Sequence, residues 1–475
     1  MSKFNQNATI KTQNKSGHSA YSMPAKSKLV TQVLTSFFNE KKFYGDNSAE
    51  IQETIKAVIL TDPKFVSNLA VFARREFNMR SVSHVLTAYL AHEIQGKPYV
   101  RETVKGVSLR GDDVTEIMAC YLSMFGKPIP NSLKKGINDV LQGLNEYTLA
   151  KYKGNGKAVK MRDLLCLCRP VPKNEEQSDM WKRLLNDELE TPYTWETELS
   201  ANGNNSETWE KLIDSGKAGY MALLRNLRNI LTANPSNVNT VLDVIQDPVR
   251  VRKSKQLPFR YLSAYKELAN IGGSRVFDVL ENAVKASIEN MPRLEGATVI
   301  AVDTSGSMSS TISAKSTVKC HEIAMMLGLI ANKICENSIF YTFDTGIQRW
   351  SVSHRTAVLE TVIKTPCGGG TDMFLPFAEM IKNNIKADRI IILSDNECNA
   401  RWGRIPVQTI ADEYRRRTGH DLWVHAIDLQ GYGTQQFYGA KTNIIAGWSE
   451  KVLDFIKLAE QGEGSLINTI EKYAF

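Results

Sequence analysis

The sequence lacks the features that mark secreted, membrane-spanning and zinc-binding proteins. Its seven cysteines are scattered, odd in number and form no CxxC pair, so neither a disulfide framework nor a zinc cluster is expected. The seven histidines are equally dispersed. The longest apolar stretch, "IAMMLGLIANKIC", is about half as long as a bilayer requires and contains Lys333, so it predicts a buried helix.

The first residues, "MSKFNQNATIKTQNKSGHSAY", are polar and carry no apolar core behind their lysine, which excludes a secretory signal and a membrane anchor. We therefore expect a cytoplasmic protein with no membrane partner. A chain of 475 residues is too long for one hydrophobic core. Its 42% hydrophobic and 23% charged residues are ordinary for two or three globular domains.

The excess of positive charge is confined to one part of the chain. From Glu295 to the end, 18 Lys and Arg stand against 20 Asp and Glu, which leaves 41 against 31 upstream. The upstream part thus carries a net charge of about +10 and the remainder about −2. Clustered Lys and Arg favour an anionic partner such as nucleic acid, and a solvated charged surface explains the excess about equally well.

Two hydrophobic patterns divide the chain. From about residue 27 to 290, apolar residues recur at three- and four-residue spacing in pieces such as "DPKFVSNLAVFARREF", which predicts an all-α array of antiparallel helices. Further on, the apolar runs "ATVIAVD", "IFYTFD", "RIIILSD" and "DLWVHAIDL" alternate with helix-like segments. They predict a doubly wound, Rossmann-like α/β domain whose ligand site lies at the carboxyl ends of its strands. We expect a polar flexible leader (1–25), a helical domain (26–290) and an α/β domain (291–475).

The segment "DTSGSMS" follows the first predicted strand. It lacks the lysine of a P-loop and the GxSxG pattern of a serine hydrolase, and it has no second carboxylate two residues after Asp303, as a phosphoaspartyl enzyme would. A cradle for a divalent ion, Mg²⁺ above all, fits better, because carboxylate and hydroxyl oxygens are the ligands this ion takes. The alternative is a capped turn that holds no ion. The predicted metal-site residues are Asp303, Ser305, Ser307, Thr371 of "PCGGGTDM" and Asp395 of "ILSDNE".

Basic residues gather in the middle of the helical region, between Lys134 and Arg169, where Tyr147 and Tyr152 are interleaved with them. Lysines neutralise phosphates, and an aromatic ring between them can stack an unpaired base, as single-stranded or structured RNA requires. Taken singly, each of these residues fits a solvated surface or an ion pair equally well. The candidate RNA-binding residues are Lys134, Lys135, Lys151, Lys153, Lys157, Lys160, Arg162 and Arg169, together with Arg225 and Arg228 of the predicted helix "MALLRNLRNILTAN".

These motifs resemble two known modules. DxSxS after a strand, a Gly-rich loop with Thr and a later strand-ending Asp are similar to the metal-ion-dependent adhesion site of von Willebrand factor A domains. The phrases "AKYKGNGK", "RDLL", "ALLRNL" and "LPFRYLSAY" upstream resemble the TROVE module of the Ro autoantigen family, of the bacterial or phage type. The resemblance covers nearly the whole chain from about residue 25. It implies a ring of HEAT-like helical repeats followed by the α/β domain.

The resemblance also implies ligands. Ser305, Ser307 and Thr371 would ligate the ion or its waters, Asp303 and Asp395 would mainly hold waters, and one coordination position would stay open for a partner's oxygen ligand. The basic face of the ring would bind a small noncoding Y-type RNA, with Lys151 and Lys153 as the best contacts, and its hole would take single-stranded 3′ ends of misfolded or precursor RNA. A 3′-to-5′ exoribonuclease is the implied protein partner.

We therefore expect a monomeric, non-catalytic RNA-binding protein of RNA quality control or processing. Some relatives have His near the end of the helix after "DLL", where this chain has Cys168 and Arg169, so the contact made at that place is open. The rival interpretation is a protein-interaction adaptor whose metal site captures a partner's carboxylate. A metal-dependent phosphohydrolase is the weakest alternative, because no second carboxylate or general base accompanies Asp303.

Overall fold

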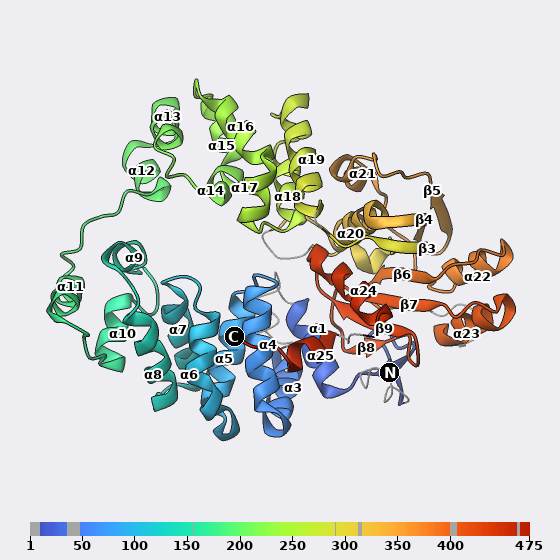
Figure 1. The fold of residues 1–475 in the computed structure, drawn as a ribbon, viewed down its shortest axis with the longest axis horizontal. Helices are drawn as coiled ribbons and strands as arrows, with labels where there is room; N and C mark the ends of the chain where they lie inside the picture. Colours follow the sequence, from blue (N-terminus) through green and yellow to red (C-terminus); the bar gives the residue numbers. More distant parts are fainter. Residues whose placement is uncertain are drawn as a thin grey trace. The chain divides into compact units, whose positions relative to one another are not determined.

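The structure, a computed structural model, describes residues 10–35, 48–154, 156–289, 291–311, 316–399, 406–462 and 466–475. The chain divides into two compact units, whose elements are labelled in Figure 1. We call Ala25–Tyr193 with Ile467–Phe475 the helical unit, and Met1–Pro24 with Thr194–Leu466 the composite unit.

The helical unit is an array of short helices, as the spacing of apolar residues predicted. Most of these helices pack on the helix after next, as in the contacts of α4 with α6, α5 with α7, and α6 with α8, and some also pack on the next helix, as α4 does on α5. Stacking of this kind buries the apolar residues of a helix between its neighbours. Closure of a ring stays a prediction. The helices are α1 (Ala25–Leu34), α3 (Ser48–Thr61), α4 (Pro63–Arg75), α5 (Ser81–His92), α6 (Lys97–Val107), α7 (Asp113–Phe125), α8 (Asn131–Leu141), α9 (Glu146–Lys151), α10 (Met161–Cys168) and α11 (Glu175–Leu185).

The C-terminal segment of the chain packs in the helical unit and not in the α/β domain where we placed it. The Asn68 side chain on α4 donates hydrogen bonds to the backbone oxygens of Ile470 and Glu471 in α25 (Leu466–Glu471), at 3.0 and 3.1 Å. The Tyr473 hydroxyl donates to Glu76 at 2.8 Å. Long-range bonds of this kind leave no mark in local periodicity. None of the described helices is both long and apolar enough to cross a bilayer.

Between its N-terminal strands and the α/β domain, the composite unit contains the helices of residues 194–289, which the predicted border near residue 290 assigns to the helical domain. Polar contacts join the last of these helices to the α/β domain. Lys266 on α18 pairs with Glu322 at 2.6 Å. The Glu281 carboxylate on α19 accepts three backbone N–H groups at the start of α21 (Val358–Lys364), including those of Val358 and Leu359 at 2.9 and 2.6 Å. The helices are α12 (Trp195–Asn202), α13 (Ser206–Asp214), α14 (Tyr220–Arg225), α15 (Leu227–Ala233), α16 (Val238–Gln246), α17 (Pro248–Ser254), α18 (Pro258–Glu267) and α19 (Ser274–Ile288).

The predicted doubly wound domain is confirmed. Its sheet has the strand order β5-β4-β3-β6-β7-β9, with every pair parallel except β4 and β5. The order reverses between β3 and β6, so the carboxyl ends of these two strands form the switch point where ligands bind in such sheets. The strands are β3 (Leu294–Asp303), β4 (Cys335–Phe343), β5 (Ile347–Trp350), β6 (Arg389–Ser394), β7 (Trp423–Asp428) and β9 (Thr442–Ala446).

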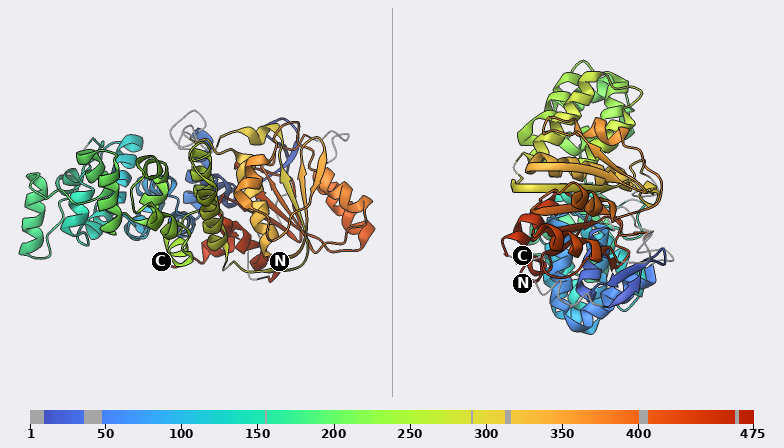
Figure 2. Two further views of the ribbon diagram at one scale, coloured as in Figure 1. Left: turned by 90° about the horizontal axis from the view of Figure 1, so that it is seen from above. Right: turned by 90° about the vertical axis from the view of Figure 1, so that its right-hand side faces the viewer.

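Helices cover both faces of this sheet (Figure 2). Val299 and Ala301 of β3 share one buried core with α22 (Leu375–Lys382) and α23 (Val407–Thr418). The alternate residue Val302 faces α20 (Cys320–Ile334), where a Cβ on Gly328 would come within 2.7 Å of it. The pleat thus sends successive side chains of β3 into two cores and fixes the strand end that carries Asp303. The other helices of this domain are α21 (Val358–Lys364) and α24 (Asp454–Glu460).

A second, three-stranded sheet corrects the prediction of a flexible leader. β1 (Lys11–Gln13) pairs antiparallel with β2 (Ser19–Ser22), and β2 pairs with β8 (Thr434–Gln435). Ala20 and Tyr21 of β2 are buried. The partner strand lies more than 400 residues away in sequence, so composition alone made this segment look unstructured. Residues 1–9 of the predicted leader lie outside the described residues.

Candidate functional site

Two loops meet at the carboxyl end of β3. The Gly306 N–H donates to the Gly369 carbonyl at 2.9 Å, and the Gly368 N–H donates to the Thr304 carbonyl at 2.8 Å. Gly306 leaves little room, since an added Cβ would lie 3.1 Å from the Gly369 oxygen, and Gly369 has a positive φ of 77°. Glycines at these places let the serine loop and the loop that carries Thr371 approach closely.

The predicted metal-site residues are brought together here. The Ser305 and Ser307 hydroxyl oxygens lie 3.2 Å apart, and the Ser305 N–H donates to the Asp303 carboxylate at 2.9 Å. Thr371 is buried two residues after Gly369, in the loop that contacts Gly306, and its carbonyl accepts the Asn399 N–H. We call Asp303, Ser305, Ser307, Thr371 and Asp395 the cradle.

The two carboxylates of the cradle are buried close together. Burial raises the pKa of Asp303, and the charge of Asp395 raises it further. Burial also raises the pKa of Asp395, with a contribution from the charge of Glu397. Holding several negative groups in a buried place is costly without a positive partner.

The donor set fits a hard divalent cation. Within the described part of the chain, one Asp395 oxygen, Oδ2, is buried without a hydrogen-bond partner, and the cradle offers hydroxyl and carboxylate oxygens. Among the described residues, no three His, Cys, Asp or Glu side chains are grouped to hold a metal, so an ion here would depend on the hydroxyls. Ser394, which sequence reasoning missed, donates to Asp303 at 2.5 Å. Its place next to Asp395 was the available signal.

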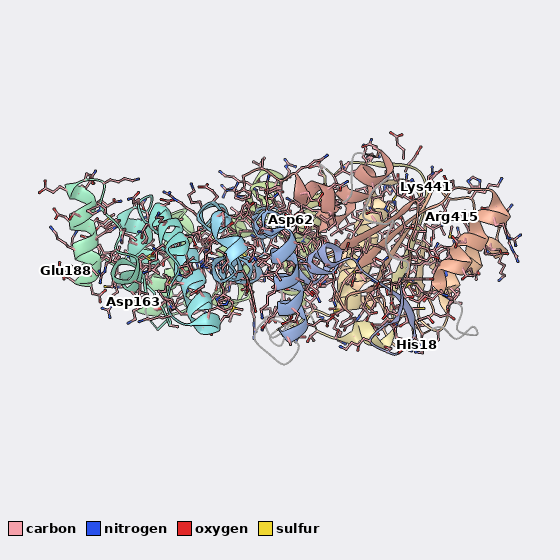
Figure 3. The ribbon with its side chains drawn as sticks, turned by 90° about the horizontal axis from the view of Figure 1, so that it is seen from below. His18, Asp62, Asp163, Glu188, Arg415 and Lys441 are labelled. Carbon is pink, nitrogen blue, oxygen red and sulfur yellow. The ribbon has the colours of Figure 1, made fainter. Side chains whose placement is uncertain are left out.

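Three of the candidate RNA-binding residues line one pocket in the helical unit. Lys153, Lys160 and Arg162 surround a pocket of about 80 Å³, closed by Leu184 and Asp187. We call it the basic pocket. Lys160 is the N-cap residue of α10, and its backbone N–H donates to the Asp163 side chain in the first turn. Asp163 is labelled in Figure 3. Asp187 pairs with Lys153 at 3.1 Å, and it belongs to none of the sequence motifs from which site residues were predicted.

Lys151, the last residue of α9, precedes the pocket residue Lys153 by two positions. Its Nζ lies 5.9 Å from the ring centre of Tyr147 and 5.6 Å from that of Tyr152. Tyr147 is 52% exposed, so a stacking partner can reach an aromatic ring beside a lysine.

The remaining candidates of the helical unit are dispersed. Lys157 is turned toward acidic groups, at 2.5 Å from Glu116. Lys134 is half-buried and Lys135 exposed on α8. Arg169 is exposed, in a left-handed conformation that ends α10.

Arg225 and Arg228 lie in the other unit and on two helices, not on the single helix we predicted. One helix ends at Arg225 and the next starts at Leu227. Between them, the Asn226 side chain donates to the Ala222 carbonyl at 2.9 Å, and the backbone of Asn226 departs from helical geometry. Both arginines are exposed, and Arg228 lies 3.4 Å from Glu267. Burial lowers the pKa of Arg260, and the nearby charge of Arg225 lowers it further.

The architecture defines a class, that of helical-repeat proteins joined to a von Willebrand factor A-type domain. A family model for the TROVE domain matches residues 22–188 and 182–334, and one for the Ro60 vWA domain matches residues 297–453. The chain therefore belongs to the Ro family.

Curated relatives are similar over about half of the chain. "Telomerase protein component 1" of Rattus norvegicus is 24% identical over 50% of this chain and 12% of its own length. The "RNA-binding protein RO60" of Caenorhabditis elegans is 25% identical over 48% of this chain and 38% of its own. That of Deinococcus radiodurans is 24% identical over 42% and 41%. The chain thus spans well under half the length of these relatives.

One solved structure is similar over nearly the whole chain. The crystal structure of the Deinococcus radiodurans RO (RSR) protein matches with a TM-score of 0.64 over 93% of this chain and 100% of that one. At 16% sequence identity, this likeness shows the fold.

Proposed function

We propose that this protein binds RNA through the basic pocket and the aromatic surface beside it. The observation that carries the proposal is the meeting of Lys153, Lys160 and Arg162 in one pocket of the helical unit. Three cations around a small opening suit a phosphate group, which accepts hydrogen bonds from several donors at once. Tyr147, held near Lys151, supplies a stacking face for an unpaired base.

The names of two relatives support this proposal, since both are RNA-binding proteins. We extend it to a small structured noncoding RNA of the Y type, and to single-stranded 3′ ends of misfolded or precursor RNA. The protein would then act in RNA quality control or processing. It would be a monomer in the cytoplasm. It would present RNA to a 3′-to-5′ exoribonuclease and would not itself catalyse a reaction. RNA hydrolysis by the purified protein that is lost in Asp303→Ala would contradict the non-catalytic role.

Binding of a structured RNA is expected to weaken steeply as salt rises. Each phosphate contact should contribute about −0.7 to −0.9 to the slope of log affinity against log salt, because cations condensed on the RNA are released. At least three contacts would give a slope of about −2 or steeper. Fluorescence anisotropy of a labelled RNA between low and physiological salt measures the slope, and a flat profile would rule out capture through phosphates.

A second role is binding of a divalent metal ion in the cradle, and it is favoured by the buried Asp395 oxygen that accepts no hydrogen bond from the described residues. Ser305, Ser307 and Thr371 would ligate Mg²⁺ or its waters, with Asp303 and Asp395 holding waters. When bound, the ion would neutralise the buried carboxylates and offer an open position to an oxygen ligand of a partner. The protein would in that case also act as an adaptor for a partner carboxylate.

The variant Asp303→Ala is expected to weaken binding of Mn²⁺, used as a probe for Mg²⁺, by at least about tenfold, since it removes a buried carboxylate that orients the cradle. Calorimetric titration of the full chain measures this affinity. Asp421→Ala is a matched control, because Asp421 pairs with Lys441 at the amino end of the strands, away from the cradle. Equal affinity in the two variants would place the ion elsewhere.

Chelation separates the two roles. If removal of divalent ions abolishes capture of a carboxylate-bearing protein partner and leaves RNA affinity unchanged, the cradle serves the adaptor role. If RNA affinity falls with chelation, the ion contributes to RNA binding.

A further inference from the structure

The turn between β1 and β2 is built to present its backbone. The Asn14 N–H donates to the His18 carbonyl at 2.8 Å, and the Asn14 side chain accepts the His18 N–H at 2.8 Å. Gly17 closes the turn with a φ of 80°. His18 marks this turn in Figure 3. The backbone N–H groups of Lys15 and Ser16 are thereby left to point out of the hairpin, which we call the N-terminal hairpin (residues 11–22).

These groups bind a buried carboxylate from the far end of the sequence. The Glu397 side chain accepts the Ser16 N–H at 2.8 Å, the Ser16 hydroxyl at 2.7 Å and the Lys15 N–H at 3.2 Å. The Asn14 amide donates to the next carbonyl, that of Cys398, at 3.2 Å. Glu397 is only 4% exposed, so the hairpin supplies the donors that its buried charge requires.

Glu397 belongs to the loop that carries Asp395. Its N–H donates to the Asp395 carboxylate at 3.1 Å, and the Asn396 N–H donates to the Ser394 hydroxyl at 3.1 Å. Ser394 in turn holds Asp303. A continuous series of hydrogen bonds therefore runs from the N-terminal hairpin through this loop to both carboxylates of the cradle.

We infer that the N-terminal hairpin is a working part of the metal cradle, and that Glu397 is the positioning residue through which hairpin docking sets the affinity for a divalent cation. The inference deepens the proposed metal-binding role and rests on it. Glu397 itself is turned to the hairpin, so it would orient Asp395 without being a ligand of the ion.

The physical reason is the cost of burying Glu397. If the hairpin leaves, the carboxylate loses three donors and must move toward water, and residues 395–399 move with it. The cation would then bind a loop that first has to be ordered, which lowers its affinity. Coupling of two binding events is reciprocal, so a bound cation must also strengthen docking of the hairpin.

The first test compares Mn²⁺ affinities of full-length variants by calorimetric titration. Glu397→Gln is expected to bind about tenfold more weakly than the unchanged chain, as for other groups that orient metal ligands. Ser16→Ala, which removes one donor and no charge, is expected to bind several-fold more weakly. Ser19→Ala is the matched control, since Ser19 is exposed in the same hairpin, and it should bind as the unchanged chain does.

The second test does not depend on a variant at Glu397. Mg²⁺ should slow hydrogen exchange of the Lys15 and Ser16 amides in the unchanged chain, and should have no effect on them in Asp303→Ala. If the unchanged chain binds no Mn²⁺, the metal-binding role fails and the inference fails with it. If it binds Mn²⁺, yet Ser16→Ala and Glu397→Gln bind equally well and the hairpin amides exchange at the same rate with Mg²⁺, only the role of the hairpin is overturned.

Discussion

Simultaneous replacement of Lys153, Lys160 and Arg162 by glutamate is expected to lower the affinity for a structured RNA about 100-fold. Loss of three phosphate contacts accounts for a large part of this factor at physiological salt, and repulsion between the new carboxylates and the phosphates adds to it. The slope of affinity against salt should become shallower in the variant, because fewer cations are released from the RNA. Anisotropy titrations at several salt concentrations measure both quantities.

A second triple variant controls for net charge. Lys64, Lys105 and Lys182 also lie in the helical unit, are exposed, and do not line the basic pocket. Their replacement by glutamate changes the charge by the same amount and is expected to weaken binding far less. Equal losses in the two triple variants would mean that RNA responds to the overall charge of the unit, and no loss in either would move the binding site elsewhere.

The sequence located the basic region but not the pocket. A dense run of lysines around "KYKGNGK" is visible in one dimension, so Lys153, Lys160 and Arg162 were all candidates. Which lysines converge depends on the fold, since Leu184 and Asp187 close the pocket from a later helix and its end. The same packing turns Lys157 toward Glu116, which spacing could not foretell.

The cradle was more predictable because its parts follow strand ends. Asp303 and Asp395 end adjacent parallel strands, and any doubly wound sheet brings such ends to one edge. The contact between Glu397 and the N-terminal hairpin was not predictable, because it joins residues about 380 positions apart through backbone N–H groups. Every residue except proline has a backbone N–H, so a contact made by these groups cannot be recognised from residue types.

For the fold, the hydrophobic pattern sufficed where an element is deeply buried. The strand of "RIIILSD" is buried throughout and the helices α4 and α5 are buried along nearly their whole length, so their residues are largely apolar. The pattern failed at Asn226, where one polar side chain bonded to its own backbone divides a predicted helix in two. It failed again for β1 and β2, whose stability depends on β8.

Asp113→Ala is expected to lower the free energy of unfolding of the helical unit by about 3–5 kcal/mol, the usual cost of removing one partner of a buried ion pair. Asp113 is fully buried on α7, and its carboxylate accepts hydrogen bonds from Arg74 at 3.1 Å and Arg80 at 2.5 Å. It also accepts the backbone N–H groups of Leu109 and Arg110, at 2.9 and 2.8 Å. Without it, the buried Arg74 guanidinium keeps its charge and loses its partner.

Hydrogen exchange of amides in α4, α5 and α7 measures the opening free energy of this unit in the full chain. The control Asp139→Ala removes an ion pair with the exposed Arg101 and should change protection little.

The stabilisation that Asp113 provides should also depend on pH. Burial alone would raise its pKa, but the His84 side chain at 3.2 Å and the charges of Arg74 and Arg80 hold it far below the ordinary 3.8. The stabilisation is therefore complete above that value and is lost as the pH falls through the lowered pKa, so the unchanged chain should approach Asp113→Ala in stability only in strong acid. A constant difference in protection between the two proteins down to the lowest pH would contradict this origin of the stability.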